Sequence, residues 1–198
     1  MKQLVQEDLL STADYERQRE AFRARIIELK RRRRISIGPL ITMVFENRDT
    51  LRFQVQEMIR VERICDPAKI QDELDVYNAL LPSRDELSAT FLIEITDEAM
   101  MKQWLDQFMG IDHGKKVAIV AGGERAFGEF EGGRSHETKI SAVHFLRFRP
   151  TKSMKAAFAD LRQPVTITVN HGSYQVEVPV PGSMREEWLS DLAESSKF

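Results

Sequence analysis

The sequence predicts an α+β protein, with a mostly antiparallel sheet, helices packed against it and a helical N-terminal third. Apolar residues recur at helical spacing in the first part of the chain. The later part holds short runs of branched and aromatic residues that are joined by glycine turns. The 198 residues, 42% of them hydrophobic, are enough for one domain with a core. We therefore expect a single domain over residues 1–198, in which residues 1–82 could form a helical subdomain.

The first predicted element is a helix. Ser11 or Thr12 can accept hydrogen bonds from the first amides of a helix, and Asp14 suits its positive end. An apolar stripe follows at steps of seven, four and three, formed by Tyr15, Phe22, Ile26 and Leu29. We expect this helix to finish in the basic run Lys30, Arg31, Arg32, Arg33 and Arg34, where cations meet the negative end of the helix dipole.

A strand and two more helices are expected next. Gly38 and Pro39 break the chain before a strand over residues 40–45. Asn47 or Asp49 caps a second helix that runs to about residue 64. A third helix opens at Pro67, where the missing proline donor has no cost, and stops at Pro82.

The rest of the chain alternates between strands and helices. We expect strands over 87–95, 116–121, 126–131, 140–148, 165–169 and 174–178, and helices over 97–109, 153–161 and a last stretch with Met184, Trp188 and Leu192. Gly122 and Gly123 lie between two of these strands, as His171 and Gly172 do between two others, which is typical of hairpins. Hairpins favour an antiparallel sheet.

Cysteine usage and hydropathy indicate the compartment. Cys65 is the single cysteine, so the chain has no internal disulfide and no four-cysteine iron–sulfur cluster. No apolar run approaches the ~18–20 residues that span a bilayer. We expect a cytoplasmic protein with no membrane association, no cofactor of its own and an inert thiol.

Motifs for common chemistries are absent from the sequence. Gly122 and Gly123 lack the spacing of a phosphate-binding or dinucleotide-binding loop. The histidines, His113, His136, His144 and His171, show no metal-ligand spacing. His144 lies within a predicted strand, so a dispersed site that joins it to Glu46 or Glu57 is the alternative that we keep open.

The basic run at residues 30–34 has two interpretations. Clustered arginines can neutralise phosphates, which is the origin of sequence-independent nucleic-acid affinity. The net charge of −2 and the absence of a nucleic-acid motif argue against this. A solvated helix end that could dock an acidic partner is the interpretation we favour.

The second helix carries an extended polar face opposite its apolar stripe. It follows Glu46 and includes Arg48, Gln54, Gln56, Glu57, Arg60 and Arg63. Gln56, Arg60 and Arg63 lie at steps of four and three and so share a face. Glu57 can pair with Arg60 one turn away. The face is either an exposed surface with ion pairs or the lining of an interface.

Several separated segments agree in order with one bacterial family. They are Phe22-Arg23-Ala24-Arg25, 45–50, 54–60, 72–78 and 141–148. On these segments the chain resembles the DUF3501 family, a domain of unknown function. The resemblance implies an interface or pocket formed by Glu46, Arg48, Gln54, Gln56, Glu57, Arg60, Tyr77, Asn78 and His144. It also implies a gene neighbourhood with rubrerythrin and a cysteine-rich iron–sulfur oxidoreductase.

Together these observations predict an accessory or docking protein for a redox or peroxide-defence system. It would not be catalytic by itself, and rubrerythrin or the iron–sulfur oxidoreductase would be its partner. The alternative is a small metal-dependent enzyme or ligand-binding domain that uses His144 with a carboxylate.

Overall fold

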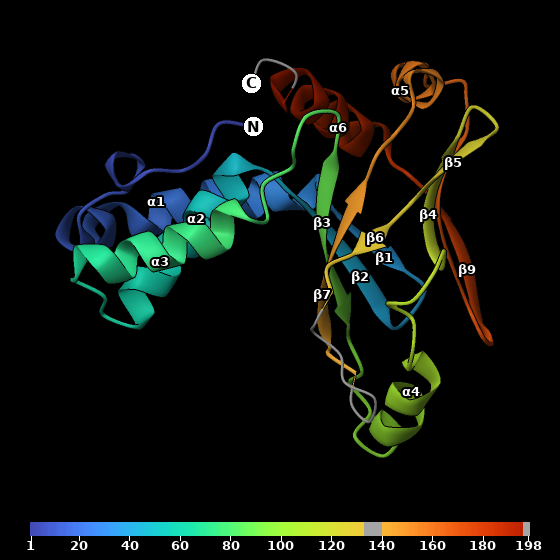
Figure 1. Ribbon diagram of the computed structural model, residues 1–198, viewed down its shortest axis with the longest axis horizontal. Coiled ribbons are helices and arrows are strands. Elements are labelled where there is room, and N and C mark those ends of the chain that lie inside the picture. The colour runs from blue at the N-terminus through green and yellow to red at the C-terminus, as the bar shows by residue number, and fades with distance from the viewer. Residues whose placement is uncertain (133–139, 196–198) are drawn as a thin grey trace.

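Two antiparallel sheets form the body of the protein, and a layer of helices projects from it (Figure 1). The computed structural model describes residues 1–132 and 140–195. Within these residues, one sheet has the strand order β1-β2-β3-β7-β6 and the other has the order β5-β4-β8-β9. The predicted α+β class with antiparallel pairing is confirmed, although the strands divide between two sheets.

The five-stranded sheet contains β1 (Arg34–Ile37), β2 (Ile41–Glu46), β3 (Leu87–Ile93), β6 (Glu129–Phe130) and β7 (Val143–Phe148). Strand β1 was not expected, because the basic run was predicted to stay helical to Arg34. The first helix instead ends at Arg31. The amide of Phe45 donates to the carbonyl of Arg33 at 2.9 Å, which extends the β1–β2 ladder back into the basic run. Pairing across the sheet therefore overrides the helical continuation.

The four-stranded sheet contains β4 (Val117–Ala121), β5 (Glu124–Phe127), β8 (Val165–His171) and β9 (Tyr174–Pro179). The chain passes from this sheet to the first one at Gly128, between β5 and β6. A Cβ atom at Gly128 would lie 2.6 Å from a methyl carbon of Leu146. A glycine is thus required where the backbone crosses between the sheets.

The main hydrophobic core lies between the two sheets and under three helices. These are α4 (Met101–Phe108), α5 (Lys152–Ala159) and α6 (Gly182–Ser195). Trp188 of α6 is fully buried, with its ring centroid 4.6 Å from that of Phe45 and 5.2 Å from that of Phe158. In Figure 1, α5 and α6 cover one end of the sheets and α4 lies at the other.

The hydroxyl of Tyr174 connects the two sheets through hydrogen bonds. It donates to the carbonyl of Ile37 at 2.5 Å and accepts from the amide of Leu40 at 3.3 Å. Gly38 has a φ of +70°, and a Cβ atom there would lie 2.6 Å from this hydroxyl. The β1–β2 turn therefore needs glycine both for its backbone conformation and for the approach of Tyr174.

Helices α1 (Thr12–Arg31), α2 (Arg48–Val61) and α3 (Pro67–Asn78) make up a helical arm. Ser11, Asn47 and Asp66 cap these helices, each accepting a hydrogen bond from an amide of the first turn. The arm has a separate apolar cluster, against which Phe145 of β7 packs and which consists of Leu4, Leu51, Val55, Ile59, Leu74, Leu80 and Leu81. Figure 1 shows the arm extending sideways from the sheets.

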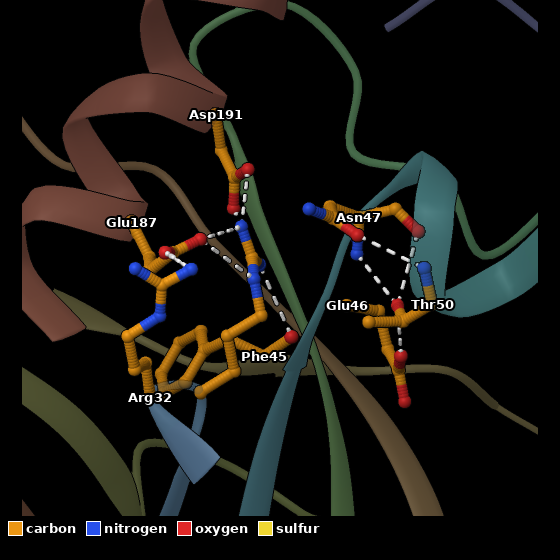
Figure 2. A network of polar contacts seen from close by, with 8 residues as sticks. Arg32, Phe45, Glu46, Asn47, Thr50, Glu187 and Asp191 are labelled. Carbon is orange, nitrogen blue, oxygen red and sulfur yellow. Dashed lines mark hydrogen bonds and ion pairs between the residues drawn. The ribbon is translucent and has the colours of Figure 1, made fainter. Parts of the chain in front are cut away.

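A buried ion pair joins the end of α1 to α6. Arg33 is 1% exposed and donates to both carboxylate oxygens of Asp191, at 2.6 and 2.8 Å. The same guanidinium donates to Glu187 at 3.1 Å and to the carbonyl of Phe45 at 3.2 Å. Figure 2 shows Asp191 and Glu187 of α6 facing Phe45 of β2, with Arg32 beside them.

Replacing Arg33 with methionine should lower the free energy of unfolding by about 3–5 kcal/mol, because Asp191 would stay buried without its counter-ion. Urea denaturation of the purified variant measures this loss. Arg31 is the matched control, since its pair with Glu28 is exposed, and Arg31→Met should change stability by about 1 kcal/mol or less. Equal losses of stability in the two variants would contradict a specific stabilising role for the buried Arg33–Asp191 pair.

Candidate functional site

Two carboxamides that were predicted to bind a partner instead hold the N-terminal segment of the chain. Asn78 accepts from the amide of Leu4 at 2.8 Å and donates to its carbonyl at 2.9 Å. Gln56 does the same for Leu10, at 2.9 and 3.1 Å. Each side chain satisfies both backbone groups of one residue, as a neighbouring strand would.

Arg48 contributes to the same attachment. Its guanidinium donates to a carboxylate oxygen of Asp8 and, at 3.2 Å, to the carbonyl of Lys2. The pair lowers the pKa of Asp8 against the effect of burial. Arg48, Gln56 and Asn78 are thus brought together by residues 1–10, which lie along α2 and α3.

Glu57 and Arg60 lie on the side of α2 that faces α1. Glu57 accepts from Arg19 through both oxygens, at 2.8 Å each, and from the hydroxyl of Tyr15 at 2.6 Å. Arg60 lies 3.5 Å from the Glu57 carboxylate. The Arg19 guanidinium holds the pKa of Glu57 at about 2, and burial next to this carboxylate raises the pKa of Tyr15. This cluster ties the first two helices together.

Glu46 is a buried carboxylate at the end of β2. It is 2% exposed and accepts from the hydroxyls of Thr50 and Thr90 at 2.5 and 2.7 Å, and from Gln54 at 3.3 Å. Figure 2 shows Glu46 directly below Thr50 at the start of α2. Burial, followed by the nearby charges of Glu73 and then Glu46, raises the pKa of Tyr77. Glu46, Gln54 and the two threonines thus form one polar layer between the sheet and the arm, whereas Tyr77 packs against the apolar cluster of the arm.

His144 lies on the other face of the same sheet. It pairs in register with Phe91, and its ring contacts those of Phe91 and Phe130 edge-on in the main core. Glu46 points to the opposite face, and Glu57 points toward α1. The structure does not bring His144 together with either carboxylate.

Arg63 lies apart from the rest of the predicted set. It follows the end of α2 with a φ of +53° and an exposed side chain. The amide of Ile64 donates to the carbonyl of Ile59 across this turn at 3.0 Å. Arg63 is therefore exposed, and its side chain takes part in none of the contacts described above for the N-terminal segment and for Glu57.

The other histidines are not assembled into a metal site. His113 is exposed next to Asp112, and His171 contacts the carbonyl of Gln107 at 3.0 Å. His136 lies outside the described residues. Within residues 1–132 and 140–195, no group of three or more His, Cys, Asp or Glu side chains is placed to hold a metal ion.

The arginines of the basic run all have acidic partners within the chain. Arg33 pairs with Asp191, and the other pairs are Arg31 with Glu28, Arg32 with Glu187 and Arg34 with Glu94, each at 3.0 Å. Most of the positive charge of residues 30–34 is thus neutralised intramolecularly. These ion pairs join the residues after α1 to α6 and to Glu94, which directly follows β3.

A groove between α1 and α2 is lined by three arginines, and two of them, Arg25 and Arg52, have no acidic partner among the described residues. It encloses about 500 Å³ and is lined by Leu10, Arg17, Gln18, Ala21, Phe22, Arg25 and Arg52, with no acidic side chain in its lining. We call it the arginine groove. The guanidinium carbons of Arg25 and Arg52 lie 4.9 and 5.5 Å from the centre of the Phe22 ring.

A smaller cavity of about 150 Å³ lies at the other edge of the polar layer, near Ser88 and Phe145. Its cation, Arg147, donates to the buried carboxylate of Glu86 at 2.8 Å and to the carbonyls of Leu81 and Ala79. Arg147 therefore already has hydrogen-bond acceptors within the protein, unlike Arg25 and Arg52.

The family model described as a protein of unknown function, DUF3501, matches residues 3–192. The chain belongs to this family. A novel protein of unknown function from Burkholderia pseudomallei K96243, known from its crystal structure, is similar to this DUF3501 chain. Their TM-score is 0.87 with 32% sequence identity, over 96% of this chain and 100% of the other. Among curated proteins, none matches the chain.

Sequence reasoning missed Arg52 in this DUF3501 protein, although a signal was present. Arg48, Arg52 and Gln56 follow one another at steps of four, so they lie along one side of α2. Arg25 was noticed only as part of a family segment. The convergence of α1 and α2 on Phe22 could not be predicted from either helix alone.

Within the described residues, no helix combines the length and apolarity needed to cross a membrane.

Asn78→Leu should release the N-terminal segment, because both hydrogen bonds to Leu4 are lost. Two such bonds are worth roughly 1–3 kcal/mol, so amide exchange of residues 2–10 should become about tenfold faster or more. Hydrogen exchange with mass spectrometry measures this rate. Asp72→Leu, which changes an exposed side chain of the same helix, should leave it nearly unchanged. Unaltered exchange in Asn78→Leu would show that other contacts hold the segment.

Glu57→Gln should destabilise the protein at neutral pH but not in acid. The pKa of Glu57 is lowered from 4.5 to about 2 in the folded protein. The stabilisation it gives is therefore present above pH 4.5 and is lost as the pH falls toward 2. Urea denaturation should show that the free energy of unfolding falls by roughly 1–3 kcal/mol at neutral pH, and that this difference from the unmodified protein becomes smaller by about pH 3. Glu62→Gln, at the exposed end of α2, is the control, and a pH-independent loss in Glu57→Gln would refute the pairing.

Proposed function

We propose that this protein is a non-catalytic accessory protein that docks onto an acidic surface of a partner protein through its helical arm. The observation that carries the proposal is the arginine groove, where Arg25 and Arg52 have no acidic partner among the described residues. Every arginine of the neighbouring basic run has one. A patch that the chain leaves charged suits a partner of opposite charge.

The shape of the molecule supports docking by the arm. The arm projects from the two sheets (Figure 1), so a partner can approach it without meeting the core. Its helices are fixed to one another through Glu57 and to the N-terminal segment through Gln56 and Asn78. A surface held in this way is already ordered before binding, which lowers the entropic cost of association.

The candidate partners are those that the family resemblance implies, namely rubrerythrin and an iron–sulfur oxidoreductase. We place the complex in the cytoplasm, since one thiol allows no internal disulfide. The function would then be a supporting role in peroxide defence or electron transfer. The alternative, a metal-dependent reaction at His144, lacks a supporting observation because Glu46 lies across the sheet and Glu57 faces α1.

Charge reversal in the groove tests the proposal. The double variant Arg25→Glu/Arg52→Glu should bind purified rubrerythrin or oxidoreductase at least about tenfold more weakly at low salt, since each change replaces attraction with repulsion. Calorimetric titration of the full chain measures the affinity, and the difference should shrink as salt screens the charges.

Two further variants make this test specific. Arg84→Glu reverses an arginine whose side chain is 73% exposed and which lies outside the arm, so it should bind like the unmodified protein. Arg63→Glu tests whether the C-terminal end of α2, which the sequence predicted to be part of the interface, also contributes to the affinity for the partner. Failure of both purified partners to bind, or equal weakening by Arg84→Glu, would reject docking through the groove.

A further inference from the structure

Phe22 holds two cationic side chains in place within the arginine groove. Arg25 comes from the same helix as Phe22, and Arg52 comes from α2. A guanidinium stacked on an aromatic ring keeps its planar fork of donors at a defined orientation. Both guanidinium groups therefore lie near one ring before any ligand arrives.

The donors of these side chains are not used by the chain. The Nε atom of Arg52 is inaccessible to solvent and has no acceptor among the described residues. Neither Arg25 nor Arg52 forms an ion pair there, whereas Arg17 in the same groove pairs with Asp14. Two like charges near one ring repel each other, and an anion between them would relieve that repulsion. The groove thus has the chemistry of an anion site whose charge the described residues of the chain do not neutralise.

The charges around the arginine groove favour a short negatively charged ligand over a long one. Asp14 and Glu28 lie on the same face of α1 as Arg25, so a long polyanion along this face would meet a carboxylate on either side of the groove. The basic run that could extend the positive surface is already neutralised by Glu187, Asp191 and Glu94. Nucleic acid therefore fits poorly, while one or two carboxylates fit well.

The groove also offers apolar surface next to its cations. Leu10, Ala21 and the Phe22 ring line it together with the arginines. A volume near 500 Å³ lies within the ~300–1,000 Å³ typical of ligand sites, enough for a few side chains. A ligand that fits should therefore combine negative charge with an apolar group.

We propose that Arg25 and Arg52, stacked on Phe22, form the binding centre for an acidic peptide segment of the partner, in which two carboxylates flank an apolar side chain. The inference rests on the proposed docking function and names the segment that the groove recognises. Each carboxylate receives donors from one guanidinium fork, and the apolar side chain lies against Leu10 and Ala21.

Short labelled peptides test the inference without the partner. In the series, two glutamates flank one leucine at different spacings, and matched peptides carry glutamine in their place. Fluorescence anisotropy with the full chain at low salt should show binding of at least one glutamate peptide and about tenfold weaker binding of its glutamine counterpart, because hydrogen bonds to an ionised carboxylate are stronger than those to a neutral amide.

Variants of the chain locate the binding. Arg52→Gln and Arg25→Gln should each weaken the peptide about tenfold, and Arg52→Lys should recover only part of the loss, since it keeps the charge without the fork. Arg23→Gln, an exposed arginine of α1 outside the groove lining, should have no effect. No binding by any glutamate peptide, or equal binding by Arg52→Gln, would overturn the inference.

Two competitors distinguish other ligands. Inorganic phosphate or a single-stranded oligonucleotide that displaced the peptide and bound more tightly would overturn the carboxylate assignment. Peptide binding without binding to purified rubrerythrin or oxidoreductase would retain this inference and reject those partners. Partner binding that persists in the Arg25→Gln/Arg52→Gln variant would reject the inference while docking elsewhere on the chain stands.

Discussion

The contact between Arg33 and Asp191 sets the relation between the main parts of the molecule. Arg33 follows α1, Asp191 lies on α6, and the shared carbonyl belongs to Phe45 of β2. Asp191 is 3% exposed, and this burial raises its pKa to about 6 even though Arg33 donates to both of its oxygens. An ion pair so deeply buried is tolerated only with complete hydrogen bonding. Helix α1, the edge of the sheet and α6 must therefore meet in one arrangement, and the arm extends from that junction.

The polar side chains of the arm act mainly within the protein. Gln56 and Asn78 bind backbone groups of residues 1–10, and Glu57 binds Arg19 and Tyr15. A donor or acceptor used in this way inside the chain must break that bond before it can bind a partner. Surface chemistry is left to side chains that the chain does not satisfy. On the arm these include Arg25 and Arg52, which is why the groove, and not the whole polar face of α2, is the docking surface we propose.

Local signals predicted most elements, and the misses have a common cause. Ser11, Asn47 and Asp66 were recognisable as caps because a cap acts on its own first turn. The Gly122-Gly123 hairpin was likewise recognisable, and both glycines have positive φ. Strand β1 was missed because four residues next to an arginine run carry little signal until they pair with β2. The short β6 was missed as a separate strand because Gly128 moves the chain to the other sheet, a change that periodicity does not record.

By itself, the sequence determined the α+β class, the order of most helices and strands, the absence of an internal disulfide and the polar character of α2. Those properties depend on residue type and on spacing over a few turns. Only the tertiary structure decided which polar groups are used and which remain available. The sequence does not show that Arg33 is buried against Asp191 whereas Arg52 lines an open groove. The difference arises because hydrogen-bond partners come from segments distant in the chain, and folding determines which of them meet.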